Sequence, residues 1–452
     1  LRSPSIPANP DVCTTTCRRT APHSRGASLR CRAAGWMRAG LVGACLFAGC
    51  AGRNDAVPSA DTTRGEAPPS PAGYVIMVSF DGFRYDYLDR GLTPVLDSLA
   101  RAGVRADGLI PVMPTKTFPN HYAIATGMYS AEHRLAANTF LDADLGLYTP
   151  ADRTTVEDGR WYGGEPIWVA ARRQGLRTAS MFWVGSEADV QGVRPDIWHP
   201  FNERVAPDAR VDSVLAWLSL PAAERPRLLT TYFEFTDNAG SWHGPESVEA
   251  DSAIARADAV MGRLVRGIRS LPHGDSVAVI VVSDHGMADV RGAVFLDEHD
   301  VSLEGVRAMF QGPFATIYAD GDSARMAALR AQLDGVPHTR TWDRSDLPRE
   351  WQWSDPRLGD LIVVAEPGWV IGRTRQNRPP GAHGWPPTMQ EMQAIFVASG
   401  AGVRKGSRIP AFRNVHIHAY VAALLGIRPG LRSAGPGPLA DQLEPQPATV
   451  RR

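Results

Sequence analysis

The apolar run YVIMVSF, residues 74 to 80, gives the first indication of the fold, because polar and apolar side chains do not alternate along it. A strand that is buried on both faces of a sheet has this pattern. Helical periodicity appears between such runs, most clearly over residues 247–270 and 323–333. The other runs of this kind are TASMFWV (178–184), LLTTYFEF (228–235), VAVIVVS (277–283), DLIVVAE (360–366) and AIFVASG (394–400). The chain is therefore predicted to be an α/β protein whose mostly parallel central sheet has helices on both faces.

One large domain and several flanking segments are predicted from composition. The domain covers residues 73–433, which hold all the strand-like runs. Residues 51–72 are small, polar and proline-bearing, which is typical of a flexible linker. Residues 434–452 contain few apolar side chains and are expected to form a loose C-terminal tail.

The first 50 residues are interpreted as a targeting region and not as part of the fold. Residues 1–36 are rich in Arg and precede Met37, so they are expected to be a non-native or mis-assigned extension. Residues 37–50 contain the apolar run AGLVGACLFAG, which suits a signal peptide. Their ending, LFAGC, resembles the lipobox of bacterial lipoproteins. It predicts an exported protein, periplasmic or tethered to the outer membrane by acylated Cys50, and secretion without an anchor is the alternative.

Cysteine usage and charge narrow the possible functions. All five cysteines lie at or before Cys50, so the domain is expected to contain neither a disulfide nor a thiolate metal site. Without residues 1–49 the formal net charge is −6, and no basic stripe stands out. We therefore expect no nucleic-acid groove, and small-molecule substrates are favoured.

Carboxylates and imidazoles follow the strand-like runs at the point where a ligand would bind in an open α/β sheet. They are Asp81, Asp237, Asp284 and His285, with His383 in the Gly-Pro loop before the last run. A single Asp at such a position usually caps a helix or turn, and a single His in such a loop is usually only exposed. Together, the five predict a site for a divalent metal, above all zinc.

The stretch PTKTFPNH, residues 114 to 121, places Thr117 two residues before a proline. A Thr hydroxyl followed by Pro in a first helical turn is typical of a helix cap. The alternative is that Thr117 is a nucleophile, which would need a nearby cation because an alcohol is barely ionised at neutral pH.

Several stretches resemble, in order, the signatures of the nucleotide pyrophosphatase/phosphodiesterase family within the alkaline phosphatase superfamily. They are VSFDGFRYDYL (78–88), MPTKTFPNHYAIATGMYSAEH (113–133), GEPIW (164–168), FWVGSEA (182–188), VVSDHGM (281–287), and AHGW (382–385) with MQAIF (392–396). The resemblance extends from about Tyr74 to Gly426 and implies an alkaline-phosphatase-like fold.

The same resemblance implies roles for residues around the catalytic threonine. Thr117 matches the family's nucleophile, which forms a covalent phospho-threonine intermediate. Asn138 matches an asparagine that donates to a non-bridging phosphoryl oxygen. Phe118 and Phe201 match the aromatic pair between which a base stacks, with Phe201 where tyrosine is usual. Core packing is the alternative for Phe201.

Two zinc ions are implied by the resemblance. The expected ligands are Asp81, Thr117, Asp284 and His285 for one ion, and Asp237 and His383 for the other. In DNAGSWHGP, residues 237 to 245, Ser241 occupies the slot of a family histidine. We expect the glycine-bounded loop to let His243 complete the second site, and a weakened second site is the alternative.

The resemblance thus implies a zinc-dependent hydrolase of phosphodiester or pyrophosphate bonds in nucleotides, which releases nucleoside 5′-monophosphate. Two alternatives remain open. One is a related hydrolase of monoesters, phosphonates or lipid head groups, in which Phe201 is only a core residue. The other is a metal-poor, non-catalytic relative that binds nucleotides, which the serine at position 241 makes possible.

Overall fold

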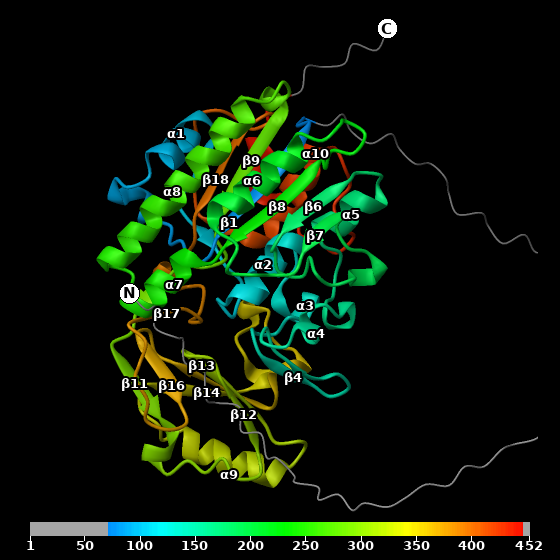
Figure 1. The fold of residues 1–452 in the computed structure, drawn as a ribbon. Helices are drawn as coiled ribbons and strands as arrows, with labels where there is room; N and C mark the ends of the chain where they lie inside the picture. Colours follow the sequence, from blue (N-terminus) through cyan, green and yellow to red (C-terminus); the bar gives the residue numbers. More distant parts are fainter. Residues whose placement is uncertain (1–70, 446–452) are drawn as a thin grey trace, which may run out of the picture. The chain divides into compact units, whose positions relative to one another are not determined.

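The computed structural model describes residues 71–445, and within them the central sheet has eight strands in the order β19-β2-β18-β9-β1-β8-β6-β7 (Figure 1). Strands β9, β1, β8, β6 and β7 pair in parallel, whereas β18 is antiparallel to both neighbours. The strands are β1 (Tyr74–Phe80), β2 (Val104–Ala106), β6 (Thr178–Met181), β7 (Ile197–His199), β8 (Leu228–Phe233), β9 (Val277–Val282), β18 (Phe396–Gly400) and β19 (Ser407–Ile409). The predicted mostly parallel sheet is confirmed.

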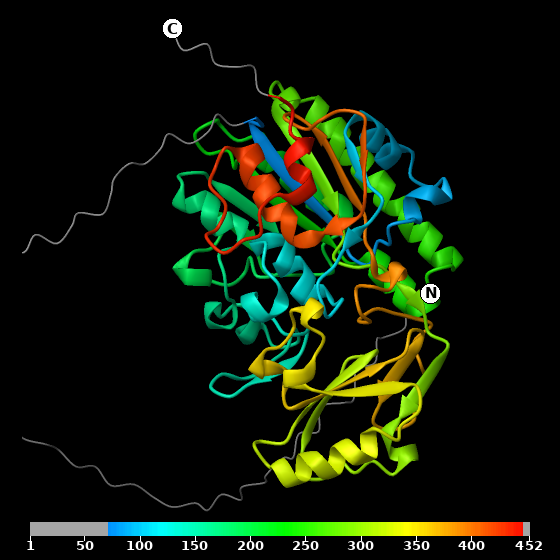
Figure 2. The same ribbon diagram turned by 180° about the vertical axis from the view of Figure 1, so that it is seen from behind.

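Both faces of this sheet are covered by helices, which explains why YVIMVSF is apolar throughout. Successive side chains of a strand point to opposite faces. Accordingly Ile76, Val78 and Phe80 pack in one core cluster, and Val75 and Met77 pack in another. The first face carries α1 (Pro94–Ala102), α6 (Pro207–Leu218) and α8 (Val248–Arg269), in front in Figure 1. The opposite face carries α2 (Thr117–Thr126), α5 (Ile167–Arg173) and α10 (Ile417–Leu425), as Figure 2 shows from behind.

The carboxyl ends of the parallel strands bring the chemically interesting residues to one edge. Phe80 is opposite Phe233 and Ser79 is opposite Val282, so β1, β8 and β9 end at the same level. Phe396, at the start of antiparallel β18, is also opposite Val282. The segment that leads into β18 therefore reaches the same edge.

A second, four-stranded sheet has the order β12-β13-β15-β14 and is antiparallel throughout. Its strands are β12 (Arg307–Phe310), β13 (Phe314–Tyr318), β14 (Thr339–Asp343) and β15 (Leu361–Ala365), and α9 (Ser323–Leu333) packs against it in a separate core cluster. The run DLIVVAE forms β15 and so belongs to this sheet, not to the central one.

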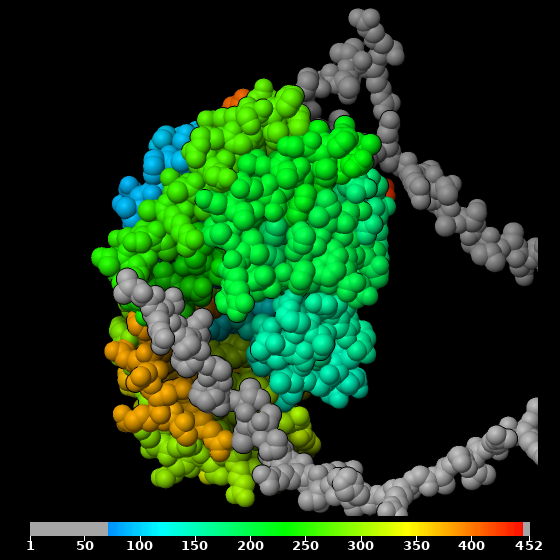
Figure 3. All heavy atoms as spheres, viewed as in Figure 1, coloured from blue at the N-terminus to red at the C-terminus, as the bar shows by residue number. Residues whose placement is uncertain are grey.

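In the space-filling view the surface has a hollow between a green part and a yellow part of the chain (Figure 3).

The remaining α-helices and strands are short, apart from α7 (Phe235–His243). They are α3 (Ser130–His133), α4 (Arg153–Val156), and the strand pairs β3 (Leu109–Ile110) with β20 (Phe412–Arg413), β4 (Phe140–Asp142) with β5 (Gly146–Tyr148), β10 (Ala288–Asp289) with β17 (Gly381–Ala382), and β11 (Gly292–Phe295) with β16 (Trp369–Gly372). Among the described residues, no helix combines the length and apolar character needed to cross a membrane.

The C-terminal segment is not loose in its described part, which corrects the prediction for residues 434–445. Residues Gly437–Gln442 form a 3-10 helix, and Leu439 is fully buried in the main core cluster. Leu443 forms an isolated bridge with Val403. The few apolar residues of this segment are enough to hold it against α10. The predicted extension, signal peptide, Cys50 anchor and linker as far as residue 70 lie outside the described residues.

Candidate metal centre

Five of the predicted metal-binding side chains meet at the carboxyl edge of the central sheet. They form two overlapping groups that share His285, namely Asp81 with Asp284 and His285, and Asp237 with His285 and His383. Nε2 of His285 lies 2.9 Å from Oδ2 of Asp284 and 3.4 Å from Oδ1 of Asp81. Nε2 of His383 lies 3.5 Å from Oδ1 of Asp237, and the two imidazole rings stack at 3.6 Å. Side chains from four separate segments thus surround one small volume.

Backbone carbonyls orient both imidazoles toward the carboxylates. Nδ1 of His285 donates to the carbonyl of Gly286 at 2.9 Å, and Nδ1 of His383 donates to the carbonyl of Thr115 at 2.9 Å. In each ring Nε2 is therefore the nitrogen that faces the acids. Such partners on the second ring nitrogen are usual for histidines that bind metals.

Asp284 is held by the turn after β9. Its Oδ1 accepts from the backbone N–H of Gly82 at 3.2 Å and from the Ser283 hydroxyl at 3.1 Å. The Ser283 hydroxyl in turn accepts from the backbone N–H of Phe83 at 3.0 Å. The residues after β1 and after β9 are thereby locked together, which fixes the carboxylates of both strands.

Three buried carboxylate oxygens in this cluster receive no hydrogen bond: Asp81 Oδ1, Asp237 Oδ1 and Asp284 Oδ2. Burial, with the charges of Asp284 and Asp237, raises the pKa of Asp81 well above its ordinary value. Burial also raises the pKa of Asp237. It acts in the same direction on Asp284, but the imidazoles of His285 and His121 outweigh it and lower the pKa of Asp284. Buried acids that repel one another and lack donors are the environment that a cation stabilises, and this donor set fits zinc.

Thr117 is the first residue of α2, and its Oγ1 lies 3.4 Å from Nε2 of His285. The cap position belongs to Lys116, whose side chain makes no capping hydrogen bond. The interpretation of Thr117 as a mere helix cap is therefore wrong, because its hydroxyl points to the cluster instead of to the backbone. The first turn of α2 also places the positive end of the helix dipole beside this hydroxyl.

Asn138 lies next to this first turn. Its Oδ1 accepts from the backbone N–H of Phe118 at 2.9 Å, which directs its amide nitrogen away from that bond. The adjacent Thr139 exchanges backbone hydrogen bonds with the Gln311 side chain, from the turn between β12 and β13. The second sheet thus supports the loop that carries Asn138.

The aromatic pair is half-buried. Phe118 makes an edge contact with Tyr148, with ring centroids 6.0 Å apart. Phe201 contacts Phe182 at 5.5 Å and Tyr232 at 5.9 Å, so it packs against a small core cluster. Phe118 and Phe201 are thus held by different neighbours, and each ring keeps part of its surface exposed.

Three further side chains belong to the cluster although the sequence interpretation did not include them. The Tyr232 hydroxyl donates to Asp81 Oδ2 at 2.6 Å, and Nδ1 of His121 lies 3.5 Å from Asp284 Oδ2. Lys116 is only 9% exposed, and burial lowers its pKa to about 8 although Asp237 and Asp81 oppose that shift. Alternation along LLTTYF could have indicated Tyr232. The four-residue step from Thr117 could have indicated His121, because residues four apart lie on the same face of a helix.

The structure does not bring His243 to the cluster, which corrects the predicted role of this residue. Residues 235–243 form α7 and not a loop, and His243 is its last residue. Its side chain is half-exposed and has Glu249 as its nearest acid, at 3.9 Å. Ser241 lies at the site instead, with its hydroxyl 3.4 Å from Asp237 Oδ2.

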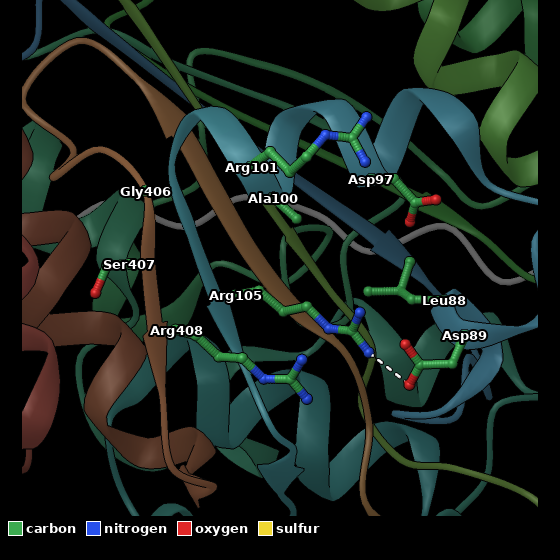
Figure 4. Close-up of a pocket in the computed structure, with 9 residues that line it drawn as sticks. All are labelled: Leu88, Asp89, Asp97, Ala100, Arg101, Arg105, Gly406, Ser407 and Arg408. Atoms are coloured by element: carbon green, nitrogen blue, oxygen red, sulfur yellow. Dashed lines mark hydrogen bonds and ion pairs between the residues drawn. The ribbon is translucent and has the colours of Figure 1, made fainter.

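A pocket of about 460 Å³ at the β2–β19 edge of the sheet shares no residue with the cluster (Figure 4). Arg101, Arg105 and Arg408 line it, together with acidic side chains. Arg105 pairs with Asp89 at 2.8 Å, as the dashed line shows, and Arg408 pairs with Asp107 at 2.6 Å. This pocket contains none of the groups of metal-binding side chains found among the described residues, so the cluster at the carboxyl edge is the candidate site.

Comparison with known proteins gives a consistent result. A sequence profile described as type I phosphodiesterase/nucleotide pyrophosphatase matches residues 75–386. Ectonucleotide pyrophosphatase/phosphodiesterase family member 1 from Rattus norvegicus is 31% identical over 394 residues, which are 83% of this chain and 43% of that protein. The chain therefore spans less than half the length of this relative. An uncharacterized pyrophosphatase/phosphodiesterase of Schizosaccharomyces pombe is 32% identical, over 78% of this chain and 77% of that protein.

Solved structures agree with the sequence matches. Murine ectonucleotide pyrophosphatase/phosphodiesterase 5 is 27% identical, with a TM-score of 0.77 over 82% of this chain and 100% of that chain. The human protein of the same name gives 26% identity and a TM-score of 0.78, with the same shares covered. An inactive variant of the murine protein, solved in complex with AMP, also has a TM-score of 0.77 to this chain.

Proposed function

The chain belongs to the type I phosphodiesterase/nucleotide pyrophosphatase family and has its alkaline-phosphatase-like fold, and on this basis we propose that it is a zinc-dependent phosphodiesterase. Its substrates are nucleotides, in which it hydrolyses a phosphodiester or pyrophosphate bond and releases nucleoside 5′-monophosphate. The observation that carries this proposal is the contact between the Thr117 hydroxyl and His285, in the middle of the carboxylate and imidazole cluster. The AMP complex of the murine neighbour supports a nucleotide substrate.

Asp81, Asp284 and His285, with Thr117, are the residues that would hold one zinc ion, and Asp237 and His383 face the place of a second. When bound, zinc supplies positive charge that favours ionisation of a neighbouring hydroxyl and offsets the charge that develops on a phosphoryl group. The unbonded oxygens of the three aspartates supply the donors that such an ion requires.

In the proposed reaction Thr117 attacks phosphorus in line with the leaving oxygen. A bond forms between Thr117 Oγ1 and phosphorus, the bond to the leaving group breaks, and a phospho-threonine diester remains. Water then attacks the same phosphorus, releases the nucleoside monophosphate and restores the hydroxyl. Splitting one difficult displacement into two is the usual advantage of a covalent nucleophile.

Asn138 and the start of α2 are proposed to hold the phosphoryl oxygens. The Asn138 amide can donate to a non-bridging oxygen, since its carbonyl oxygen is already fixed by the N–H of Phe118. The start of α2 adds the positive end of the helix dipole. The exposed surfaces of Phe118 and Phe201 are proposed to stack against the nucleoside base.

We also propose that the protein is exported. Several relatives that it matches are named ectonucleotide enzymes or venom phosphodiesterases, which supports export of this chain. The signal peptide, the acylated anchor at Cys50 and a periplasmic or outer-membrane location remain proposals that rest on the sequence of residues 37–50.

The experiment that tests this function compares two chromogenic substrates in the presence of zinc. The p-nitrophenyl ester of thymidine monophosphate is a diester with a base, and p-nitrophenyl phosphate is a monoester without one. The proposal predicts a higher kcat/KM for the diester. Faster turnover of the monoester would favour the alternative hydrolase, and no turnover of either would favour the non-catalytic alternative.

A further inference from the structure

We propose that this chain binds two zinc ions with very unequal affinity, so that one is retained and the second is gained only at high free zinc. The inference rests on the proposed function and concerns how that activity is regulated. It follows from the side chains that α7 presents to the cluster.

The first zinc position has a complete protein ligand set. Asp81, Asp284 and His285 come within one group, and the Thr117 hydroxyl lies beside the shared imidazole. Tetrahedral zinc sites are completed by four donors, of which a catalytic site keeps one for water or substrate. Backbone hydrogen bonds hold both Asp284 and His285 in place at this position.

The second position has Asp237 and His383 as its own donors, and it shares the imidazole of His285 with the first position. It therefore lacks a third strong donor of its own. Asp237 and Ser241 are one helical turn apart in α7, so they present their side chains on the same face. A histidine at position 241 would therefore reach the volume between Asp237 and His383. Serine places a short neutral hydroxyl there, 3.4 Å from Asp237 Oδ2, and a neutral hydroxyl is a far weaker zinc ligand than imidazole.

His243 cannot supply the missing donor without unwinding the helix. It lies six residues after Asp237, which corresponds to a rotation of about 240° around the helix axis. Its side chain is 50% exposed and lies near Glu249. The backbone of α7 is also fixed at Gly240, where a Cβ would come within 2.9 Å of Met287 Cγ.

The chain as a whole should therefore show two separated zinc-binding steps. After dialysis against metal-free buffer we expect about one zinc ion per chain by atomic absorption. Calorimetric titration with zinc should then show a second step at least about 10- to 100-fold weaker than the first, the factor that weakened metal sites commonly lose. Two zinc ions retained by the dialysed wild type would overturn the proposal.

Two variants test whether position 241 causes the difference in zinc affinity between the two positions. Ser241→His should raise the retained zinc to about two ions per chain, because it adds the third donor to Asp237 and His383. The matched control His243→Ala should retain the same zinc content as the wild type. Loss of a zinc ion in His243→Ala would overturn the proposal, and so would an unchanged zinc content in correctly folded Ser241→His. Because the wild-type titration needs no variant, it decides the matter even if Ser241→His does not fold.

Turnover measured during the same titration separates this inference from the proposed function. If the rate rises with the second zinc step, the proposed function and the unequal zinc affinities both stand. If the zinc contents are as expected and neither wild type nor Ser241→His shows turnover at saturating zinc, the proposed function fails while the unequal sites remain. If the enzyme is active and the wild type retains two zinc ions, only this inference fails.

Discussion

The Thr117 hydroxyl is available for chemistry because nothing else in the described structure uses it. An ordinary threonine at a helix start bonds to the backbone of the first turn, which satisfies a free N–H group. Thr117 is instead one position inside α2, and its hydroxyl has His285 as its hydrogen-bonding neighbour. Replacement of this residue should therefore change reactivity much more than helix stability.

Thr117→Ala should abolish diester hydrolysis while the fold and most of the bound zinc are retained. We expect kcat to fall by at least about a thousandfold, since loss of a nucleophile removes the covalent route altogether. Thr117→Ser is the matched control and should keep measurable turnover, because it retains a hydroxyl. Steady-state kinetics with circular dichroism check this. Near-normal turnover in Thr117→Ala would show that another group attacks phosphorus.

Asn138→Ala should lower kcat by about 100- to 1000-fold, the loss that follows removal of one donor to a developing oxyanion. The variant also frees the N–H of Phe118, so the rate must be compared with a control in which that bond survives. Asn138→Asp is that control, because a carboxylate still accepts from Phe118 but cannot donate to phosphate. Equal loss in both variants assigns the effect to the amide donor. Substantial recovery in Asn138→Asp would contradict it.

Some members of the site could be predicted from the sequence and others could not. Asp81 and Asp284 lie within two residues of the ends of β1 and β9, and Asp237 lies in the first turn of the helix that follows β8. Parallel strands bring their carboxyl ends to one edge, so these positions could be predicted. Lys116 gave no such signal, because a lysine is normally solvated and its burial depends on the loops around Gly384 and Gly312. A local pattern can therefore locate strand-end acids but not a cation that distant loops enclose.

At the scale of elements, α7 shows how a glycine can be misinterpreted. The spacing of Gly240 and Gly244 suggests a flexible loop, yet Gly240 lies inside a helix against Met287. Here glycine is required for close packing, and only Gly244, with φ of 97°, marks the end of the helix. The sequence alone cannot distinguish a glycine that bends the chain from one that lets a neighbour approach.

Helix α10 supplies a test of stability against pH through His418. This buried imidazole donates to the carbonyl of Ala125 at 2.7 Å and accepts from the N–H of Gly430 at 2.9 Å, so it is bound in its neutral form. Burial lowers its pKa from 6.5 to about 4. A base whose pKa is lower in the folded state stabilises the fold above its unfolded pKa, and this stabilisation is lost as the pH falls from 6.5 toward 4.

We expect His418 to lower the free energy of unfolding by about 2 kcal/mol between pH 7 and pH 5. Urea denaturation at the two pH values measures this. In His418→Gln that part of the pH dependence should disappear, even if the variant is less stable throughout. His199→Gln, which alters an exposed histidine, should keep the wild-type dependence. An unchanged pH dependence in His418→Gln would exclude the buried imidazole as its source.

At the scale of the whole molecule, the second sheet could not be assigned from the sequence. The LIVVA of DLIVVAE is as uniformly apolar as the VAVIVV of VAVIVVS, yet the first forms β15 of the antiparallel sheet and the second forms β9 of the central sheet. Burial on both faces gives the same local pattern in either sheet. Which sheet a strand joins depends on long-range contacts that periodicity does not encode.

Arg357 joins the segment before β15 to the loops beside the candidate site. It is almost completely buried and donates to Asp142 Oδ2 at 2.6 Å, to the carbonyl of Arg134 at 2.7 Å and to that of Trp161 at 2.8 Å. Asn138 lies between two of these partners in sequence. The same guanidinium therefore stabilises the fold and positions the loop that is proposed to bind the phosphoryl group.

Arg357→Met should destabilise the protein by roughly 3 kcal/mol, because it leaves Asp142 and two carbonyls without their buried partner. It should also lower kcat for the diester at a temperature where the variant is still folded. Arg349→Met, at an exposed position, should change neither quantity. Urea denaturation with kinetics tests both parts. A stability loss without any change in kcat would show that Arg357 supports the fold alone.

The most direct test of the proposed mechanism is the stereochemistry at phosphorus. A nucleotide diester whose phosphorus is made chiral by one sulfur atom is hydrolysed in water enriched in heavy oxygen, and the configuration of the nucleoside phosphorothioate product is determined. Each in-line displacement inverts phosphorus, so attack by Thr117 followed by attack of water predicts net retention. Net inversion would mean that water attacks the substrate directly, and it would contradict the proposal that Thr117 is the nucleophile.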